Sequence, residues 1–419
     1  MFDAPPREKP WVSWFYVIIW TLVIFATIPL ARGLQDYVSR QWGSAAFTYT
    51  VLGAVGAAFA TAVVHLRGKP ATPGRSYLWL LAVAAVFGGY TLKLGVEIPE
   101  EAIHFIQYGL LGILVYRALT HRLRDMGIYL AAAMICGIIG TLDEVVQWLI
   151  PGRYWGLNDI WINFLAAALV QIAIAEGLKP KIIGGRPNRA NLRFLLRLAI
   201  AAGLLFGTSL LNTPARIAWY TARIPGLMFL AEHESVMLEY GYRYHDPDIG
   251  IFRSRIAPAA LKQTDAERAQ EAATILDRFQ EGATYPAFLK LYTPVNDPFV
   301  HEARVHLYRR DVHFEQASQY EHDPPRYAAH LSVAFRENRI MEKYFPNTLA
   351  HSAYVWSADQ RALSGKHLLQ EEEYDSAVSQ TLVTQVTERQ VAYLFIILLG
   401  GLTGWHGYLG KHPVSRPSS

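Results

Sequence analysis

The chain has 419 residues, of which 52% are hydrophobic and 18% are charged, and its formal net charge is +4. This composition is too apolar for an ordinary soluble protein and too polar for a chain that lies in the membrane throughout. The basic residues form no basic and aromatic module of the kind that reads bases, so we expect no nucleic-acid partner. The only cysteine, Cys136, excludes a disulfide within the chain and a cysteine-based metal site.

Long apolar runs fill residues 1–211, and one more lies within residues 389–419. A helix needs about 20 mostly apolar residues to cross a bilayer core of roughly 30 Å. The first run, Trp11–Leu30, lacks a small-residue cleavage pattern and is predicted to be a retained helix. The runs that meet the length criterion are 11–31, 45–66, 76–94, 102–119, 127–150, 159–178, 194–212 and 391–409. They predict a mainly α fold, a polytopic bundle of about 8 transmembrane helices.

Lysine and arginine concentrate in alternate loops, and this bias predicts the orientation because cytoplasmic loops carry the excess. Both termini are expected to be cytoplasmic, in a bacterial inner membrane, and residues 212–388 to be periplasmic or extracellular. The opposite loops hold Arg32, Arg40, Lys93 and Arg153. The residues expected on the cytoplasmic side are Arg7, Lys9, Arg67, Lys69, Arg75, Arg117, Arg122, Arg124, Lys179, Lys181, Arg186, Arg189, Arg193, Lys411 and Arg416.

Polar residues gather at three predicted helix ends that this topology puts on the extracytoplasmic side. Glu101, His104 and Tyr108 have the spacing i, i+3, i+7 and share one face of the fourth helix. Charged groups at such depth are costly unless they pair or face water, so their convergence favours a ligand-binding or catalytic site. The cluster comprises Glu97, Glu100, Glu101, His104, Tyr108, Asp143, Glu144, Gln147, Arg153, Asp159 and Asn163.

The same residues also allow a purely structural role. Acids and amides at helix ends often cap or pair with neighbours, and Arg153 could neutralise Asp143 or Glu144 merely to hold the bundle. In an enzyme, Arg153 would hold a phosphate or carboxylate, and His104 beside Glu144 would move a proton. No single motif dictates a reaction, so both alternatives stay open at this point.

Two segments of the cluster resemble the motifs of the VanZ-like family. The first runs from Glu101 through His104-Phe and Tyr108 to a Leu-Gly pair, and the second runs from Asp143-Glu144 through the turn Pro151-Gly152-Arg153. The resemblance covers about 95–178. It implies as ligand-binding residues Glu101, His104, Tyr108, Glu144, Gln147, Arg153, Asp159 and Asn163.

The resemblance implies a membrane protein of the bacterial envelope, linked to low-level teicoplanin resistance, and it supplies no biochemical activity. Residues 154–156, Tyr-Trp-Gly, stand where the family often has Ser or Thr, and residues 164–166, Phe-Leu-Ala, replace expected glycines. We expect the site to bind a polar or anionic headgroup at the outer leaflet, lipid-linked glycan or glycopeptide-related. The expected partners are membrane lipids and a lipid-linked envelope precursor.

Residues 212–388 have the mixed pattern of an α+β extracytoplasmic domain between the last two membrane helices. Helices are predicted over Asp265–Phe279 and Pro325–Tyr344, a strand over Val305–Tyr308 and a turn at 246–250. The domain holds most of the fourteen histidines, but none has the spacing of a helical metal motif, so no metal or cofactor is expected. The best-spaced groups are His301-Glu302 with His306, and His245 with Asp246 and Asp248, while Ser235 and Ser254 lack a nucleophile turn.

A different class of function stays open beside headgroup binding. The bundle would then be an anchor, and residues 212–388 would dock other membrane proteins as an accessory subunit. A transporter is the weaker alternative because the sequence has no inverted repeat and few polar residues at mid-bilayer depth.

Overall fold

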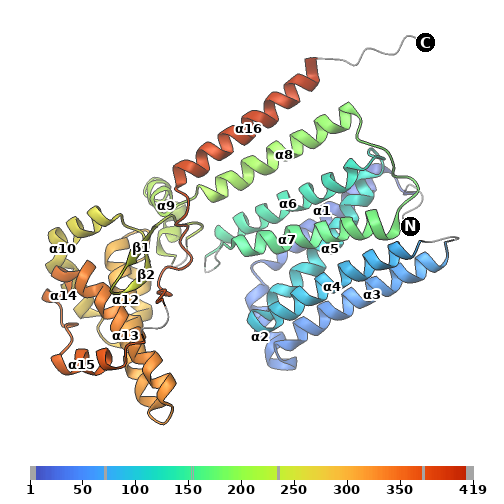
Figure 1. Ribbon diagram of the computed structural model, residues 1–419. Coiled ribbons are helices and arrows are strands. Elements are labelled where there is room, and N and C mark those ends of the chain that lie inside the picture. Colours follow the sequence, from blue (N-terminus) through green and yellow to red (C-terminus); the bar gives the residue numbers. More distant parts are fainter. Residues whose placement is uncertain are drawn as a thin grey trace. The chain divides into compact units, whose positions relative to one another are not determined.

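The computed structural model describes residues 6–69, 73–151, 153, 155–233, 236–369 and 373–411. Their contacts divide the chain into two units, drawn in Figure 1. The membrane unit comprises Met1–Thr208 and Leu394–Ser419, and the inserted unit comprises Ser209–Tyr393. Among the residues named above, Gly152, Tyr154, Ser235 and Arg416 lie outside the described residues.

Within the described part of the chain, eight spans are long and apolar enough to cross a membrane, which confirms the expected number. Pro10 and Pro99 begin two of them, at the first helical position, where the missing N–H costs no hydrogen bond. Two spans are composite, because η1 leads directly into α5 and α7 continues into the π-helical turn η2. The elements are α1 (Pro10–Thr27), α2 (Ala31–Trp42), α3 (Ala45–Arg67), α4 (Gly74–Glu97), η1 (Pro99–Ala102), α5 (Ile103–Leu119), α6 (Gly127–Trp148), α7 (Leu157–Ile172), η2 (Ala173–Leu178), α8 (Arg189–Leu210) and α16 (Glu388–Lys411).

The first span is shorter than its apolar run. We expected one helix over 11–31, but α1 ends at Thr27 and a separate helix, α2, begins at Ala31. The sequence analysis missed α2 because it is too short and too polar to cross a membrane. It ends at Trp42 and is followed by Gly43, whose φ of 78° lies in the left-handed region that favours glycine. The other predicted bounds differ from the observed ones by a few residues.

The helices α5, α6 and α7 form the centre of the membrane unit. About half of each span is buried (56%, 50% and 50%), against 11% of α3 and 6% of α16. Small residues let these helices approach closely: a Cβ at Gly112 of α5 would lie 3.5 Å from the Cα of Ala167 in α7. Leu111 and Val115 are fully buried in this core. Because α5, α6 and α7 occupy the centre, most of the surface of the outer helices is exposed.

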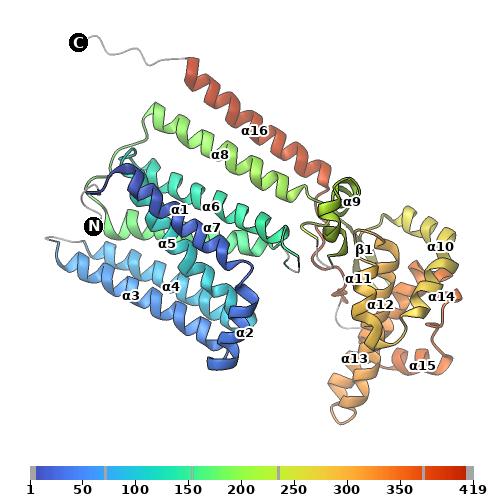
Figure 2. The same cartoon turned by 180° about the vertical axis from the view of Figure 1, so that it is seen from behind.

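The helices α8 and α16 run side by side in opposite directions, in both views (Figures 1 and 2). Their contact is close because Gly203 and Gly207 carry no side chain. A Cβ at Gly203 would lie 3.1 Å from Leu399, and one at Gly207 would lie 3.1 Å from the ring of Phe395. At the far end, Nε of Arg189 donates to the carbonyl oxygen of Leu409 at 2.5 Å. These helices lead into and out of the inserted unit.

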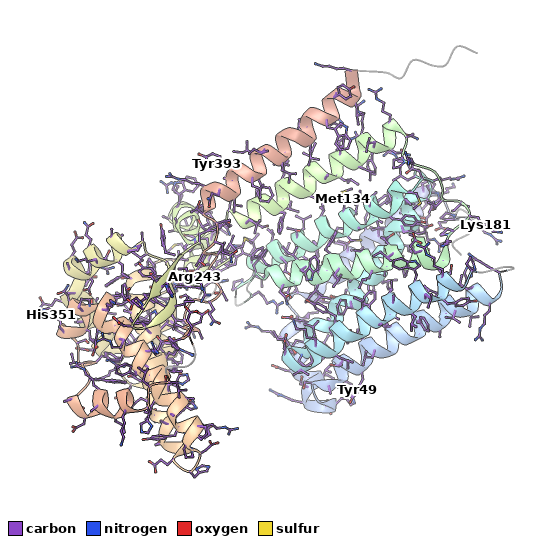
Figure 3. All side chains as sticks on the ribbon, viewed as in Figure 1. Tyr49, Met134, Lys181, Arg243, His351 and Tyr393 are labelled. Atoms are coloured by element: carbon purple, nitrogen blue, oxygen red, sulfur yellow. The ribbon has the colours of Figure 1, made fainter. Side chains whose placement is uncertain are left out.

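The inserted unit is built mainly from helices and contains one two-stranded antiparallel sheet, β1 with β2, in the described residues. Its side chains are drawn in Figure 3, which labels Arg243 on β1 and His351 on α14. The helices α12 and α13 pack along each other, with Leu307, Ile340 and Met341 buried between them and their neighbours. The elements are α9 (Pro214–Thr221), η3 (Pro225–Glu232), β1 (Tyr242–Asp246), β2 (Gly250–Ser254), α10 (Pro258–Arg278), η4 (Gly282–Thr284), α11 (Tyr285–Leu291), α12 (Pro298–Ala317), η5 (Ser318–Tyr320), α13 (Pro324–Tyr344), α14 (Pro346–His351) and α15 (Ala358–Lys366).

Four local predictions for this unit can be compared with the structure. The helices predicted over 265–279 and 325–344 exist as α10 and α13, and the turn at 246–250 joins β1 to β2, with Gly250 at φ 113°. The strand predicted over Val305–Tyr308 is wrong, because these residues lie inside α12. Their aromatic and β-branched side chains favour a strand locally. Ala303 and Leu307, however, are both buried and lie four residues apart, which is a helical spacing.

Candidate functional site

The polar site is built where η1 and α5, the end of α6 and the start of α7 meet. The three helices pack pairwise in the centre of the membrane unit. The loop between α6 and α7 adds Arg153, Trp155 and Gly156 to it. The structure brings together all eight residues implied by the family resemblance, which are Glu101, His104, Tyr108, Glu144, Gln147, Arg153, Asp159 and Asn163, and Asp143 joins them through the contacts described below.

A buried hydrogen bond joins α5 to α6. The hydroxyl of Tyr108 donates to Oδ2 of Asp143 at 3.0 Å, and both side chains are almost fully buried. The imidazole of His104, one turn earlier, stacks on the Tyr108 ring with centroids 6.3 Å apart. Gly140 makes room for this arrangement, since a Cβ there would lie 2.9 Å from Asn163 and 3.4 Å from the Tyr108 ring.

A second set of bonds ties the loop to the end of α6. The backbone N–H of Gly156 donates to Oε2 of Glu144 at 3.2 Å, and Nε2 of Gln147 donates to Oε1 of the same carboxylate at 3.1 Å. Nη2 of Arg153 in turn donates to the side-chain oxygen of Gln147. Glu144 is fully buried, so these contacts hold a carboxylate in the bundle interior.

The start of α7 supplies the third side of the site. Nδ2 of Asn158 lies 3.4 Å from Oε2 of Glu101, which links α7 to η1. Asp159 stands beside Gly156, where a Cβ would lie 3.2 Å from its Oδ2. The charge of Asp159 interacts with those of Glu101, Glu144 and His104, so the carboxyl groups of all three helices share one electrostatic environment.

Several polar atoms of the site are buried yet find no hydrogen-bond partner among the residues that the structure describes. Buried polar groups normally pair, and an unpaired one costs about 1–3 kcal/mol. Such atoms are scattered elsewhere in the chain, but here several lie in one place and include both donors and acceptors. They are Nδ1 of His104, Oδ1 of Asp143, Nε of Arg153, Nε1 of Trp155, Oδ1 of Asp159, and Oδ1 and Nδ2 of Asn163.

The ionisable groups of the site are mostly acidic. They are the carboxyl groups of Glu101, Asp143, Glu144 and Asp159, together with the guanidinium of Arg153 and the imidazole of His104. Such a set accepts hydrogen bonds from hydroxyl or ammonium groups through its carboxylates. The same site can donate hydrogen bonds from the guanidinium of Arg153, the indole of Trp155 and the amide of Asn163. His104 interacts with Asp143 and Asp159 and is the residue placed to exchange a proton with a bound group.

Sequence reasoning missed Trp155, Gly156 and Asn158 as parts of the site. Trp155 and Gly156 entered the analysis only as departures from the family pattern. Asp143 was seen in the polar cluster but was not among the matched positions, although it receives the Tyr108 bond. The i, i+4 spacing of Asp143 and Gln147 could have indicated that Asp143 belongs to the site. The positions of the loop residues depend on how the chain turns between α6 and α7, which the spacing does not indicate.

The histidines of the two best-spaced groups, His245, His301 and His306, have separate partners. Nδ1 of His301 bonds to the carbonyl oxygen of Tyr292 at 2.8 Å, and Nε2 of the exposed His245 lies 3.0 Å from Glu373. Nδ1 of His306 bonds to Oε2 of Glu337 at 2.6 Å. In the described residues, no three His, Cys, Asp or Glu side chains group in a way that could hold a metal ion.

Glu337 organises a buried polar centre in the inserted unit. Burial alone would raise the pKa of its carboxyl, but the His306 imidazole and the hydroxyls of Ser376 and Tyr374 hold this pKa below its usual value. Those hydroxyls donate to Oε1 at 2.6 and 2.5 Å, and Nε of Arg309 lies 3.3 Å away. The network connects α12 and α13 to the segment that leads to α16, which is a structural role.

Fold and site together define a polytopic helical membrane protein with a polar cluster at one end of its central helices. No family model, curated protein or solved structure matches the chain.

Proposed function

We propose that the chain is a VanZ-like protein of the bacterial cytoplasmic membrane, and that its polar site binds the headgroup of an envelope lipid. The observation that carries this proposal is the set of buried, unpartnered donors and acceptors contributed by α5, α6, α7 and the loop, within the described part of the chain. A bound polar group that pairs with them would recover much of the free energy lost on burying them.

The chemistry of the site favours a hydroxylated headgroup, such as the sugar of a lipid-linked glycan precursor. The carboxylates of Asp143 and Asp159 accept hydrogen bonds from hydroxyls, while Nε of Arg153 and Nε1 of Trp155 donate to sugar or carbonyl oxygens. A strongly anionic group fits less well, because Arg153 is a single fixed cation among four carboxyl groups. A phosphate next to the sugar would lie near Arg153.

The topology supports a location at the outer leaflet. By the distribution of lysine and arginine, the loops after α3, α5 and α7 are cytoplasmic, so the start of α5, the end of α6 and the start of α7 lie at the opposite surface. This is the surface where envelope precursors are used. Catalysis is not part of the proposal, although His104 is placed for proton transfer.

The test compares two buried aspartates of the same bundle. Asp143→Asn changes the site, whereas Asp125→Asn changes a carboxylate at the other end of α6, where it accepts bonds from Gly127 and Asn191. In a bacterium that depends on the protein for teicoplanin tolerance, Asp143→Asn and Arg153→Ala should remove tolerance and Asp125→Asn should keep it. Mass spectrometry of lipids co-purified with the wild type should show a glycan-bearing lipid that the Asp143→Asn protein lacks.

The competing function, an anchor for a docking domain, gives a different pattern. Deletion of residues 212–388 would then remove tolerance, while Asp143→Asn and Arg153→Ala would behave as the wild type. Equal loss in all variants, including Asp125→Asn, would indicate misfolding of the bundle and would also overturn the proposal.

A further inference from the structure

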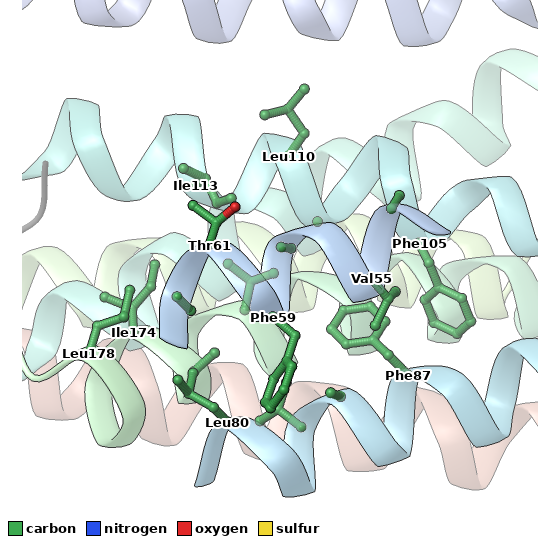
Figure 4. Close-up of a pocket in the computed structure, with 18 of the residues that line it drawn as sticks. Val55, Phe59, Thr61, Leu80, Phe87, Phe105, Leu110, Ile113, Ile174 and Leu178 are labelled. Carbon is green, nitrogen blue, oxygen red and sulfur yellow. The ribbon is translucent and has the colours of Figure 1, made fainter. Parts of the chain in front are cut away.

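A second site in the membrane unit is apolar. A cavity of about 630 Å³ opens between α3, α4, α5 and the end of α7 with η2, as Figure 4 shows. The labelled side chains of Phe59, Leu80, Phe87 and Ile113 form its walls, and the only polar side chains among its lining residues, all of them described, are Thr61 and His65. This volume falls in the usual range of ligand pockets, roughly 300–1,000 Å³.

The cavity suits a hydrocarbon chain. Its apolar walls offer almost no hydrogen bonds to water, and a void between membrane helices would forfeit dispersion contacts that an aliphatic chain restores. Along α3 the lining extends from Ala54 to His65, a rise of about 16 Å at 1.5 Å per residue. This length is close to one leaflet, about half of the roughly 30 Å hydrocarbon core. The small side chains of Ala54, Ala58 and Ala62 keep the groove open along one stripe of α3.

Basic residues follow or precede the helix ends at one end of the groove. The last lining residues at this end are His65 of α3 and Leu178 of η2, and Nζ of Lys69 donates to the carbonyl oxygen of Leu178 at 3.0 Å. Lys179 follows directly and lies 4.0 Å from Glu176, an acid of the same turn. The other cations that follow or precede these helix ends are Arg67, Arg75 and Lys181. Each basic residue near a membrane surface favours anionic lipid by about 1 kcal/mol or a severalfold change in affinity.

From this combination we propose that the groove binds an anionic phospholipid, with one acyl chain between α3, α4 and α5 and the phosphate at Lys69 and its neighbours. The basic end of this groove lies away from the polar site, since Leu178 ends η2 whereas Asp159 lies in the first turn of α7. At its other end the groove lining includes Phe105, the residue after His104. The proposal does not depend on the proposed function of the polar site.

The test uses the full-length protein in detergent and native mass spectrometry. Phosphatidylglycerol and phosphatidylethanolamine with identical acyl chains are added in equal amounts, and the bound fractions are compared. We expect one phosphatidylglycerol to be retained preferentially, and Lys69→Gln to reduce its affinity about fivefold, the effect of one basic contact. Binding of phosphatidylethanolamine should fall less, because its ammonium group leaves that lipid without net charge.

Two variants of α3 locate the acyl chain. Ala58→Phe fills the groove and should reduce binding of both lipids. Ala57, the preceding residue on the same helix, does not line the groove, so Ala57→Phe should leave binding as in the wild type. Equal retention of the two lipids by the wild type would overturn the headgroup assignment. Unchanged binding in Ala58→Phe would overturn the placement of the chain, and the wild-type competition decides the matter if that variant fails to fold.

Discussion

The hydroxyl of Tyr108 and the carboxylate of Asp143 meet across the contact between α5 and α6, 3.0 Å apart and almost fully buried. The other carboxylate oxygen of Asp143 has no partner within the described residues. The tyrosine therefore supplies the only hydrogen bond found there for this aspartate, and it lies at the base of the polar site.

Tyr108→Phe should destabilise the membrane unit by about 1–3 kcal/mol, because it leaves a buried carboxylate without its donor. Thermal unfolding of the full chain in detergent would measure the loss. The double variant Tyr108→Phe with Asp143→Ala is the control. It should lose less than the sum of the two single changes, since no unpaired carboxylate remains. Strictly additive losses would show that the two side chains do not interact.

Gly140→Ala should force α6 away from α7. Its Cβ would lie 2.9 Å from the Cβ of Asn163 and 3.4 Å from the Tyr108 ring, and overpacking of this kind costs about 1–3 kcal/mol. Gly89→Ala in α4 is the matched control, because nothing lies within 4 Å of its added Cβ, and it should gain up to about 1 kcal/mol from helix propensity. Thermal unfolding should thus move in opposite directions for the two variants, and a similar shift in both would contradict the close contact.

The inserted unit should lose stability between about pH 6.5 and pH 4 because of His301. Burial, with help from the charge of Arg255, lowers the pKa of this imidazole from 6.5 to about 4. The unfolded chain takes up the proton across this window whereas the folded chain does not, so falling pH favours unfolding. His301→Asn retains a donor for Tyr292 but removes one titrating group, and it should reduce the dependence of the melting temperature on pH. The rest of the dependence should remain, because burial also lowers the pKa of His313 from 6.5 to about 4. A wild-type profile that is already flat in this range would refute the assignment.

Asp297→Ala should cost more than Asp323→Ala, although both residues cap a helix that begins with proline. Asp297 accepts from the N–H of Val300 and also pairs with both terminal nitrogens of Arg268, at 3.0 and 2.7 Å. Asp323 accepts from Arg326 at 3.4 Å on the surface. Loss of a cap costs about 0.5–2 kcal/mol. Asp297 adds a part-buried ion pair with Arg268, whereas the ion pair of Asp323 with Arg326 is exposed and therefore contributes less. Urea unfolding of the full chain would rank them, and equal losses would rule out a contribution from Arg268.

The amino-acid pattern was enough to predict the membrane spans and the polar faces of α5, α6 and α7. Apolar length and helical spacing are local properties of a sequence. The span over 45–66 and the shared helix face of Glu101, His104 and Tyr108 can therefore be predicted from the sequence alone. The helix α2 was missed because it is too short and too polar to cross a membrane. The helical state of Val305–Tyr308 was missed because tertiary packing outweighs local preference there. The positions of Asn158 and Trp155 in the site, and the groove beside α3, depend on how separate helices pack against one another. A single sequence does not show this packing.

The pairing of α8 with α16 sets an order of events during synthesis. Gly203 and Gly207 leave a shallow surface on α8 that Leu399 and Phe395 cover. Translation proceeds at roughly 5–20 residues per second, so the partner helix emerges on the order of ten to forty seconds after α8. During that interval the whole inserted unit is made and can fold while α8 still lacks its neighbour. A nascent chain halted before residue 388 would therefore leave α8 open to capture by an insertase or by another copy.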